Sequence, residues 1–465
     1  MEQPVAVPPD APTHETPAPA AKQSGEEFVA ALRGAAPYVH AHHGRTFVIA
    51  FPGETCARAN FDELLSDIAL LSSLGVKLVL VHGARPQIDS ELAIRGLRPT
   101  YAGDLRITDD AAMTAVKAAV GALRMDIEAA LSSSLANTPM GGARIKVVGG
   151  TWVTARPVGV RDGVDHLLTG QVRRVDIDAI REVLAAERIA LLSPVGYSPT
   201  GEAFNLRNAE VAEAVAIGLG ADKLVFVLES DPATWSIASS AGDAGHLLLG
   251  EAERSLAGRP VMDQLSAEDR NCVRAGLSAG RSGVKRVHLV GAGTDGALLR
   301  ELYTRDGAGL MLYADTDYEA TRQATIEDVA GIQALIKPLE AAGILVPRSR
   351  EQLELDIDTF SVLVRDGTVI ACHALIEYPD DDAAEFACVA VHPQYRGGHR
   401  ARSLLMRAEV TARRRGISRL FVLTTRTTHW FVEHGFVAGG PDDLPVARQA
   451  AYDARRNSHV LVKSL

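Results

Sequence analysis

Short apolar runs alternate with helical patterns from residue 46 to about residue 312. The apolar runs at residues 46–51 and 76–83 are each followed by an amphipathic pattern, at residues 61–75 and 86–96. Strands that are apolar on both faces and alternate with helices are typical of a parallel sheet covered by helices on both sides. We therefore expect residues 25–312 to form one α/β domain built on an open, mostly parallel sheet.

An amphipathic segment precedes the first strand. In residues 26–40, Phe28, Leu32 and Ala35 recur at helical spacing, which predicts a short helix. Its apolar stripe can pack on its own domain or on a neighbouring subunit. Residues 1–24 carry six of the 22 prolines among alanine, threonine and glutamate, a composition that predicts a disordered tail.

A different pattern begins after residues 313–321, which we interpret as a linker. Asp366 and Gly367 lie between two apolar runs within residues 361–378, which predicts a β-hairpin. Further elements are expected at residues 385–393, 399–416 and 458–464. This mixture of hairpin, helices and strands predicts that residues 322–465 form a separate α+β domain.

Composition narrows the class of protein. The chain has 47% hydrophobic and 23% charged residues, as in soluble globular proteins, and no apolar run approaches the ~18 residues of a membrane-spanning helix. We expect a cytoplasmic protein. The net charge of −10 disfavours nonspecific nucleic-acid binding. The four cysteines lack metal-ligand spacing, so we expect reduced, packed thiols and no metal.

Two loops of the first domain resemble those of the amino-acid kinase family, N-acetylglutamate kinase in particular. FVIAFPG and VHGARPQI stand where those kinases have Lys-x-Gly-Gly and His-Gly-Gly-Gly-Pro-Gln-Ile. Ala50 offers no donor to a phosphoryl group, Pro52 lacks an N–H, and Arg85 crowds a loop that needs glycine. Ala209 replaces the expected aspartate, with Glu210 beside it. We predict that this domain does not transfer phosphate.

The end of the first domain carries a second resemblance. RVHLVGAGTDGALLRELYTRDGAG is similar to the segment that holds the inhibitor in arginine-sensitive N-acetylglutamate kinases. A carboxylate suits the cationic groups of arginine, and a glycine turn brings backbone groups close to a ligand. The residues implied for an allosteric L-arginine site are Tyr38, Lys223, Glu301, Asp306, Gly307 and Gly309. The alternative is that Lys223 and Glu301 are solvated surface charges.

The second domain resembles the GNAT acetyltransferases in EFACVAVHPQYRGG, LFVLTTRTTHWFVEHGF and RRNSHVLV. With the first domain, nearly the whole chain after residue 25 resembles the arginine-regulated N-acetylglutamate synthases of bacteria. The resemblance implies transfer of an acetyl group from acetyl-CoA, a co-substrate, to the α-amino group of L-glutamate. It also implies feedback inhibition by L-arginine, and a homo-oligomer, specifically a hexamer.

Acetyl-CoA carries a pyrophosphate, which backbone amides at a helix N-terminus can bind. Its thioester carbonyl can be polarised by amides of a splayed strand. The residues that the resemblance implies for acetyl-CoA are Val389, Val391, Arg396, Gly397, Gly398, Arg400, Ala401, Arg402 and Arg448, with Arg426 as a further candidate. His399 departs from the family pattern, which has glycine there.

The amine of free glutamate is protonated near pH 7, so a base must remove a proton before attack. Glu385 is the candidate base, and Thr424 is a candidate acid because Phe431 stands where many relatives have tyrosine. Guanidinium groups suit the two carboxylates of glutamate. The implied glutamate-binding residues are Arg348, Arg456 and Ser458. Cys388 is interpreted as a packing residue rather than an acyl-carrying nucleophile.

Two other functions remain open at this point. The first is a non-catalytic arginine-sensing protein, against which the retained Glu385, Arg348 and Arg456 argue. The second is a bifunctional N-acetylglutamate kinase and synthase, against which Ala50 argues.

Overall fold

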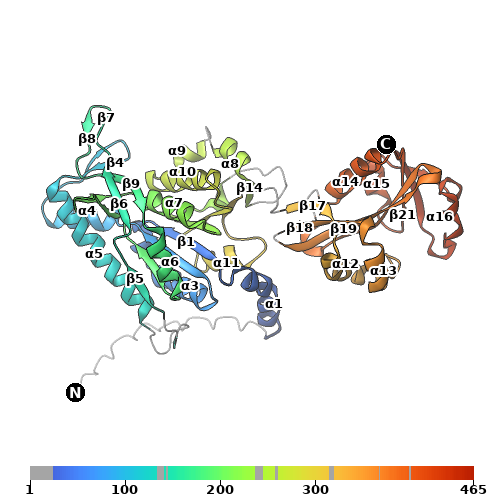
Figure 1. The fold of residues 1–465 in the computed structure, drawn as a ribbon, viewed down its shortest axis with the longest axis horizontal. Helices are drawn as coiled ribbons and strands as arrows, with labels where there is room; N and C mark the ends of the chain where they lie inside the picture. The colour runs from blue at the N-terminus through green and yellow to red at the C-terminus, as the bar shows by residue number, and fades with distance from the viewer. Residues whose placement is uncertain are drawn as a thin grey trace, which may run out of the picture.

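The computed structural model describes residues 25–133, 141–142, 145–235, 245–256, 260–313, 319–365, 367–396 and 400–465. It shows two domains joined end to end (Figure 1). The tail expected at residues 1–24 lies outside this range. Within the described ranges, every helix is too short or too polar to cross a membrane.

The first domain is built on an eight-stranded sheet of order β14-β16-β15-β13-β1-β2-β10-β5. Its strands are β1 (Thr46–Phe51), β2 (Lys77–His82), β5 (Val147–Gly149), β10 (Ile189–Leu192), β13 (Lys223–Leu228), β14 (His246–Leu248), β15 (Arg286–Gly291) and β16 (Leu310–Tyr313). All neighbours pair in parallel except β15 and β16, which are antiparallel. The open, mostly parallel sheet expected from the alternating pattern is confirmed.

Helices cover both faces of this sheet. On one face lie α3 (Phe61–Ser73), α4 (Arg85–Ile94), α5 (Asp110–Ser132) and α11 (Ala297–Tyr303), and on the other α6 (Ile177–Ala185), α7 (Asn208–Leu219), α8 (Leu249–Leu256) and α10 (Ala267–Arg281). Side chains along β1 alternate between the two cores: Phe47 and Ile49 enter the first, Val48 and Ala50 the second. This two-sided burial explains why β1 is apolar throughout.

Smaller elements complete the first domain. A four-stranded sheet has the order β12-β11-β6-β9, and two hairpins pair β3 with β4 and β7 with β8. Their bounds are β3 (Thr100–Ala102), β4 (Leu105–Ile107), β6 (Val153–Pro157), β7 (Val160–Arg161), β8 (Val164–Asp165), β9 (Gly170–Val175), β11 (Val195–Tyr197) and β12 (Ala203–Asn205). Two short helices are α2 (Gly53–Cys56) and α9 (Pro260–Gln264).

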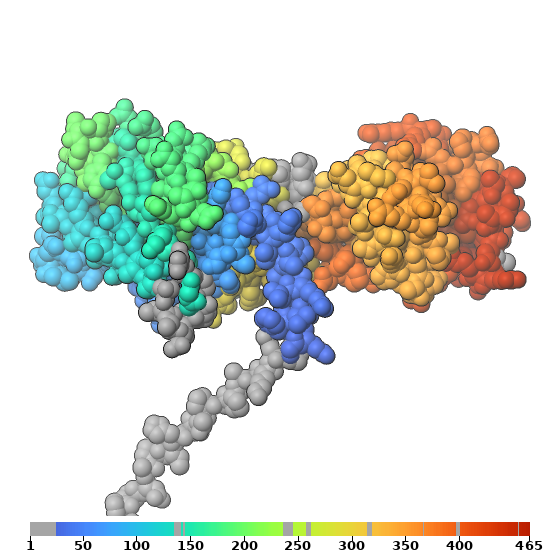
Figure 2. Space-filling model, turned by 60° about the horizontal axis from the view of Figure 1, so that its bottom comes forward, coloured from blue at the N-terminus to red at the C-terminus, as the bar shows by residue number. Residues whose placement is uncertain are grey.

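Helix α1 (Gly25–His42) is longer than expected and packs mainly through its carboxyl end. The His42 ring is buried and lies 5.2 Å from the ring of Phe47 and 5.3 Å from that of Tyr303. Phe28 and Leu32, two members of the expected apolar stripe, are 59% and 58% exposed. Figure 2 shows α1 projecting beside the junction of the two domains.

The second domain holds a seven-stranded sheet of order β17-β18-β19-β20-β21-β23-β22. Its strands are β17 (Glu319–Gln323), β18 (Phe360–Arg365), β19 (Thr368–Tyr378), β20 (Ala383–Val391), β21 (Arg419–Thr424), β22 (Val437–Gly439) and β23 (His459–Ser464). Its helices are α12 (Val329–Ala341), α13 (Arg350–Leu355), α14 (Arg400–Arg414), α15 (Thr428–Glu433) and α16 (Val446–Ala450). The α+β architecture and the β18–β19 hairpin are confirmed, although Asp366 lies outside the described residues.

The boundary between the domains differs slightly from the expected linker at residues 313–321. Tyr313 closes β16, and Glu319 opens β17, which pairs with β18 in the second sheet. Only residues 314–318, outside the described ranges, lie between the two sheets. Glu319 is therefore part of the second domain.

Candidate functional site

The sheet of the second domain splits between its two central strands. β20 pairs in parallel with β21 only from Ala383 to Glu385, whereas β21 stays paired with β23 as far as Thr424. Beyond the split, β20 bulges at Cys388, whose φ of 52° lies in the left-handed region. The gap lets a ligand reach the edge of β20 that faces β21.

A cleft of roughly 1580 Å³, part of it open solvent, occupies this gap. Its lining comes from both faces of the sheet: Cys388 and Leu345 belong to the face covered by α12, whereas Trp430 and Phe431 belong to the face covered by α14. Val389 and Val391, whose amides were expected to polarise the thioester carbonyl, also line the cleft. The cleft therefore lets two molecules approach each other from opposite faces of the sheet.

Glu385 is the last residue of β20 that pairs with β21, and its carboxylate is bound by Arg448. Nε of Arg448 donates to its Oε2 at 2.8 Å and Nη2 to its Oε1 at 3.4 Å. Burial opposes the charge of Arg448, but the hydrogen bond and the charge of Glu385 raise the pKa of Arg448. Arg448, expected to bind acetyl-CoA, therefore binds Glu385 instead. The cleft is lined by Phe386 and Ala387, which follow Glu385 in the chain.

Thr424 lines the cleft on the opposite side of the split. Its hydroxyl lies 3.0 Å from that of Thr427 and accepts hydrogen bonds from the N–H groups of Arg426 at 3.3 Å and Thr427 at 3.2 Å. These two donors leave the proton of Thr424 free to point at Thr427 or into the cleft. Arg426, the further acetyl-CoA candidate, also lines the cleft.

Two of the three residues expected to bind glutamate, Arg348 and Arg456, lie near the end of α12. The guanidinium of Arg456 donates to the carbonyls of Gly343 at 3.3 Å and Ile344 at 3.0 Å, and Ile344 lines the cleft. Arg348 lies close enough to the cleft residue Cys388 for its charge to act on that thiol. The carbonyl of Ser458 accepts from the hydroxyl of Tyr452 at 3.1 Å.

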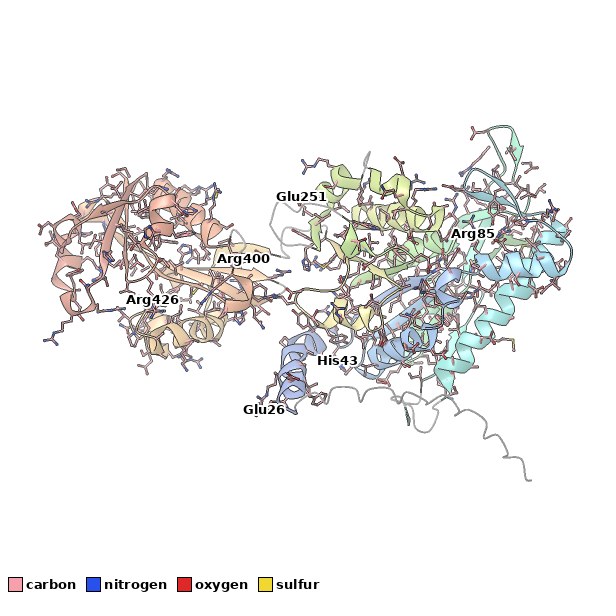
Figure 3. The ribbon with its side chains drawn as sticks, turned by 180° about the vertical axis from the view of Figure 1, so that it is seen from behind. Glu26, His43, Arg85, Glu251, Arg400 and Arg426 are labelled. Atoms are coloured by element: carbon pink, nitrogen blue, oxygen red, sulfur yellow. The ribbon has the colours of Figure 1, made fainter. Side chains whose placement is uncertain are left out.

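The residues expected to bind the pyrophosphate divide into three groups. Arg396 and Ala401 line the cleft, and Arg402 is exposed on the first turn of α14. Gly397 and Gly398 lie outside the described residues, as does His399. The guanidinium of Arg400 instead lies on Glu319, at 3.0 Å from Nε to Oε1 and 2.9 Å from Nη2 to Oε2. Figure 3 shows Arg400 on the side of the second domain that faces the first.

Cys388 is buried at the bulge, and burial raises the pKa of its thiol to about 11, against the opposing charge of Arg348. A thiol with this pKa is almost entirely protonated at neutral pH. Because the thiolate is the nucleophilic form, the geometry supports packing over covalent catalysis.

In the first domain, the two kinase-like loops pack closely against each other. Nε2 of Gln87 donates to the carbonyl of Gly53 at 2.9 Å. A Cβ on Gly53 would lie 2.7 Å from the backbone nitrogen of Arg85, and one on Gly83 would lie 2.7 Å from that of Gly53. Ala50 is buried in the sheet. Backbone this close leaves no space for a side chain at Gly53 or Gly83.

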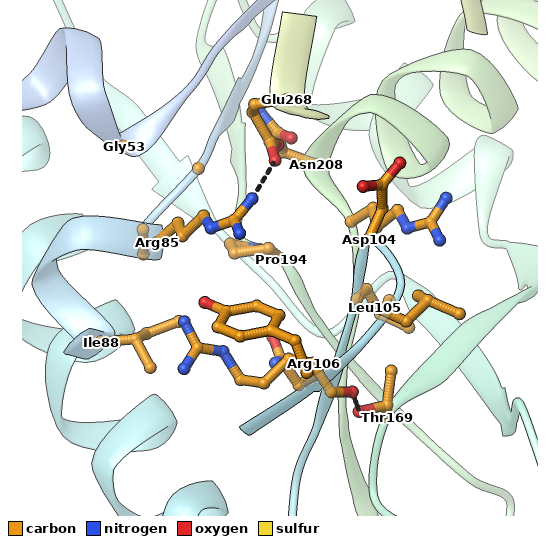
Figure 4. Close-up of a pocket in the computed structure, with 16 residues that line it drawn as sticks. Gly53, Arg85, Ile88, Asp104, Leu105, Arg106, Thr169, Pro194, Asn208 and Glu268 are labelled. Carbon is orange, nitrogen blue, oxygen red and sulfur yellow. Dashed lines mark hydrogen bonds and ion pairs between the residues drawn. The ribbon is translucent and has the colours of Figure 1, made fainter. Parts of the chain in front are cut away.

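Two further details bear on the prediction that this domain does not transfer phosphate. Ala209 is buried, and Oε1 of Glu210 accepts from the N–H of Val172 at 2.8 Å, so this carboxylate serves the neighbouring strand. In the remaining pocket, of about 580 Å³, Nη1 of Arg85 lies 3.7 Å from Oε2 of Glu268 (Figure 4). Burial and the charge of Glu54 raise the pKa of Glu268 to about 7 despite Arg85.

A second cavity, of about 1740 Å³ including open solvent, lies where α1, the first domain and the second domain meet. It brings together four residues expected in the allosteric site: Tyr38, Lys223, Glu301 and Asp306. The two glycines of the same loop, Gly307 and Gly309, line the adjoining pocket.

Lys223 and Glu301 are joined by a histidine that sequence reasoning did not single out. Nζ of Lys223 lies 3.4 Å from Nε2 of His288, and Nδ1 of His288 lies 2.6 Å from Oε1 of Glu301. Burial and the charge of Lys223 lower the pKa of His288, so we assign the neutral ring, which accepts from Lys223 and donates to Glu301. Burial would raise the pKa of Glu301, but His288 and the amide of Ala308 lower it to about 2.

Glu301 also fixes the glycine loop. Its Oε2 accepts from the N–H groups of Ala308 at 2.8 Å and Gly309 at 2.9 Å. A Cβ at Gly309 would lie 2.1 Å from the carbonyl oxygen of Leu289, and Gly307 has a φ of 67°. Only glycine fits both positions without displacing the backbone. The reading of Lys223 and Glu301 as solvated surface charges is therefore wrong for Glu301, which is 8% exposed.

The sequence analysis did not identify five residues that contribute to these sites: His288, Arg305, Glu319, Arg365 and Tyr395. All but His288 lie where the two domains meet and contact residues far away in the chain. Across the described ranges, no cluster of histidine, cysteine, aspartate or glutamate can hold a metal ion.

Comparisons with known proteins agree with this division into two domains. The sequence model of the amino acid kinase family matches residues 45–232, and that of the acetyltransferase (GNAT) family matches residues 332–436. An amino-acid acetyltransferase of Pseudomonas fluorescens is 49% identical over 443 residues, which cover 94% of this chain and 100% of the relative. One of Azotobacter vinelandii is 49% identical over 440 residues, with the same coverage.

Two solved structures of one protein also match over most of the chain. The N-acetylglutamate synthase of Neisseria gonorrhoeae complexed with coenzyme A and L-arginine is 38% identical, with a TM-score of 0.82, covering 94% of this chain and 99% of that one. The same synthase complexed with coenzyme A and N-acetyl-glutamate has the same identity and coverage but a TM-score of 0.57.

Proposed function

Because the chain belongs to the amino-acid acetyltransferases, we propose that it transfers the acetyl group of acetyl-CoA to the α-amino group of L-glutamate. The products are N-acetyl-L-glutamate and CoA. The observation that carries this proposal is the cleft at the split between β20 and β21, which opens to both faces of the sheet. Such a cleft suits a reaction in which two substrates meet without a covalent enzyme intermediate.

Acetyl-CoA enters from the face covered by α14 in this proposal. Arg396 and the amides that open α14 receive the pyrophosphate, because a helix N-terminus and a cation both favour anions. The thioester carbonyl accepts from amides of β20 around Val389 and Val391, which line the cleft. These donors stabilise the negative charge that develops on the carbonyl oxygen in the transition state.

L-Glutamate enters from the face covered by α12. Arg348 and Arg456 provide guanidinium groups for its carboxylates, although Arg456 must then exchange a carbonyl partner for the substrate. Glu385 first takes a proton from the α-ammonium group through water, because the cleft is lined by its neighbours rather than by Glu385 itself. The neutral amine then attacks the thioester carbon, forming the C–N bond.

Collapse of the tetrahedral intermediate breaks the C–S bond and releases CoA as a thiolate. Thr424, which lines the cleft, can donate a hydrogen bond to the departing sulfur, and the thiolate takes up the proton that the attacking nitrogen still has to lose. Since the ordinary pKa of a thiol is roughly 8.5, the thiolate is a tolerable leaving group without a strong acid.

L-Arginine inhibits this reaction from the interdomain cavity in our proposal. Tyr38, Lys223, Glu301 and Asp306 line that cavity, and Oε1 of Glu301 keeps a lone pair for a cation beyond its bond from His288. At equal identity and coverage, the structure is more similar to the N. gonorrhoeae synthase with L-arginine than to the same protein with N-acetyl-glutamate. This supports an arrangement of the domains like that of the arginine complex.

The oligomeric state and the cellular location are also proposals. The exposed Phe28 and Leu32 of α1 suit contact with a neighbouring subunit, which supports a homo-oligomer such as the hexamer implied by the resemblance. A cytoplasmic location remains a prediction.

The experiment that tests the proposed function is product identification. The purified chain is incubated with acetyl-CoA and, separately, L-glutamate, D-glutamate, L-aspartate, L-glutamine or L-lysine, and the products are identified by mass spectrometry. N-Acetyl-L-glutamate as the preferred product supports the proposal. Preference for another amino acid, or acetyl-CoA consumption that is independent of any amine, would refute it.

A further inference from the structure

An ion pair ties the start of α14 to the first strand of the second domain. Arg400 and Glu319 meet through two parallel hydrogen bonds, at 3.0 and 2.9 Å, although they lie 81 residues apart. The side chain of Arg400 is 6% exposed, and its Nη1 donates to the carbonyl of Tyr395 at 3.1 Å. A buried, bidentate pair of this kind fixes both partners in direction as well as in distance.

This pair holds the chain neighbours of two residues that line the acetyl-CoA cleft of the proposed reaction. Arg396 and Ala401 line the acetyl-CoA cleft, and each is the chain neighbour of a residue held by the pair: Tyr395 and Arg400. Three nitrogens of Arg400 donate to Glu319 or Tyr395. Arg400 therefore acts on the cleft through the backbone rather than through its own charge.

The same group of side chains reaches the first domain. Nη1 of Arg365 lies 3.7 Å from Oε2 of Glu319, and Nη2 lies 3.3 Å from Nε2 of His246 in β14. The side chain of Arg365 is 6% exposed. His246 is also among the groups that lower the pKa of Glu301, the residue that holds the glycine loop of the first domain.

Tyr395 is the second point of contact between the domains. Three guanidinium groups lie against its ring: Arg305 at 5.4 Å, Arg365 at 5.5 Å and Arg400 at 5.6 Å. Arg305 belongs to the first domain and pairs with Asp306, which lines the interdomain cavity. Contacts between a cation and an aromatic ring depend strongly on position. A shift of the loop that carries Arg305 therefore changes the surroundings of Tyr395.

We propose that Glu319 and Arg400 are positioning residues for acetyl-CoA, and that contact of Arg305 with Tyr395 makes this positioning depend on the allosteric loop. The inference rests on the proposed function and adds the residues through which the first domain acts on the reaction. Its physical basis is that Tyr395 and Arg400, the neighbours of the cleft residues Arg396 and Ala401, are held in place. Arg400 is held by the buried ion pair with Glu319, and Tyr395 by the cations against its ring.

The first arm of the test measures CoA affinity by calorimetry, which needs no turnover. Glu319→Gln and Arg400→Lys each remove the bidentate ion pair, and the dissociation constant of CoA is expected to rise roughly tenfold or more. Arg414→Gln, at the exposed far end of α14, is the matched control. Unchanged CoA affinity in both variants, with unchanged thermal melting, would overturn the positioning role.

Steady-state kinetics separate positioning from a merely structural role. We expect the KM for acetyl-CoA to rise while kcat and the KM for glutamate change by less than about threefold. A uniform loss of kcat with an unchanged KM for acetyl-CoA would contradict the inference. Failure of the wild-type chain to acetylate glutamate would refute the proposed function but leave the result for CoA affinity standing.

The second arm tests the link to the first domain. Arg305→Met removes the cation from the Tyr395 ring, and Arg305→Lys keeps one. In the methionine variant, Arg365 and Arg400 still lie against the Tyr395 ring, so the basal KM for acetyl-CoA is expected to change by less than about threefold. The concentration of L-arginine for half-inhibition is expected to rise at least fivefold, within the usual range of allosteric coupling. The lysine variant should recover part of the effect. Wild-type inhibition in Arg305→Met would contradict the coupling.

Discussion

Arg448 donates to the carboxylate of Glu385 at 2.8 Å, at the position where β20 and β21 cease to pair. The two residues lie 63 positions apart in the chain, and both side chains are largely buried. The pair places a carboxylate beside the cleft in a fixed orientation. It also means that a base at this position must accept its proton while remaining bound to a cation.

The first prediction concerns Glu385. Glu385→Gln keeps the shape of the side chain and an oxygen for Arg448 but removes the base. We expect kcat to fall about 10²- to 10⁴-fold, with little change in either KM, because proton removal is lost and binding is not. Glu433→Gln, on the exposed surface of α15, is the control. A kcat within about fivefold of the wild type would exclude Glu385 as the base.

A second prediction concerns recognition of glutamate. Arg348→Gln removes a guanidinium near the bulge of β20, and we expect the KM for glutamate to rise roughly 10- to 100-fold, the usual effect of a lost charge-assisted hydrogen bond. The KM for acetyl-CoA should stay unchanged. Arg350→Gln, two residues on and 71% exposed, tests whether any nearby arginine matters. Equal effects of both variants would contradict a specific role for Arg348.

Cys388 provides a third prediction. Since burial raises the pKa of this thiol to about 11, Cys388→Ala should keep kcat within about threefold, and no acetylated enzyme should form. Intact-protein mass spectrometry after brief mixing with acetyl-CoA alone checks the second point. An adduct of acetyl mass that disappears in Cys388→Ala would show a covalent route and refute direct transfer.

The fourth prediction concerns pH and Glu301. Its pKa in the folded chain is about 2, below the ordinary 4.5, so its contribution to stability is fully present above pH 4.5 and is lost as the pH falls towards 2. Glu301→Gln should lower the free energy of unfolding by on the order of 1–3 kcal/mol at pH 7. In urea titrations this difference should shrink as the pH falls from 4.5.

Asp306→Asn is the matched control for this titration, because Asp306 is 75% exposed on its side chain and pairs only locally with Arg305. We expect its effect on unfolding to be small at every pH. A difference between wild type and Glu301→Gln that stays constant down to pH 2.5 would contradict the ionised, hydrogen-bonded state assigned to Glu301.

Much of the architecture could be predicted from the sequence because it depends on local patterns. The apolar runs around Phe47 and Leu80 require burial on both faces, and this specifies a parallel sheet covered by helices. The two domains and their families followed from motifs that occupy contiguous stretches. Ala50 and Pro52 each lack a group that phosphoryl transfer needs, and the loss of that activity stays a prediction.

The partners of the charged side chains could not be predicted in the same way. Arg400 matches a family position for acetyl-CoA, yet its guanidinium binds Glu319, and Arg448 binds Glu385. His288 lies within an apolar strand, and nothing in its local sequence indicates that it joins Lys223 to Glu301. These contacts depend on which strands become neighbours and how two domains meet. A motif specifies a residue's place in the chain but not the partner it meets after folding.

The most direct test of the account is CoA release by the full chain given acetyl-CoA and L-glutamate, with and without L-arginine, alongside ATP consumption in the presence of N-acetylglutamate. We predict thiol release that requires glutamate and is suppressed by L-arginine, with no ATP consumed. Absence of glutamate-dependent thiol release would contradict the acetyltransferase assigned to the second domain, and ATP consumption would contradict the loss of phosphoryl transfer predicted for the first.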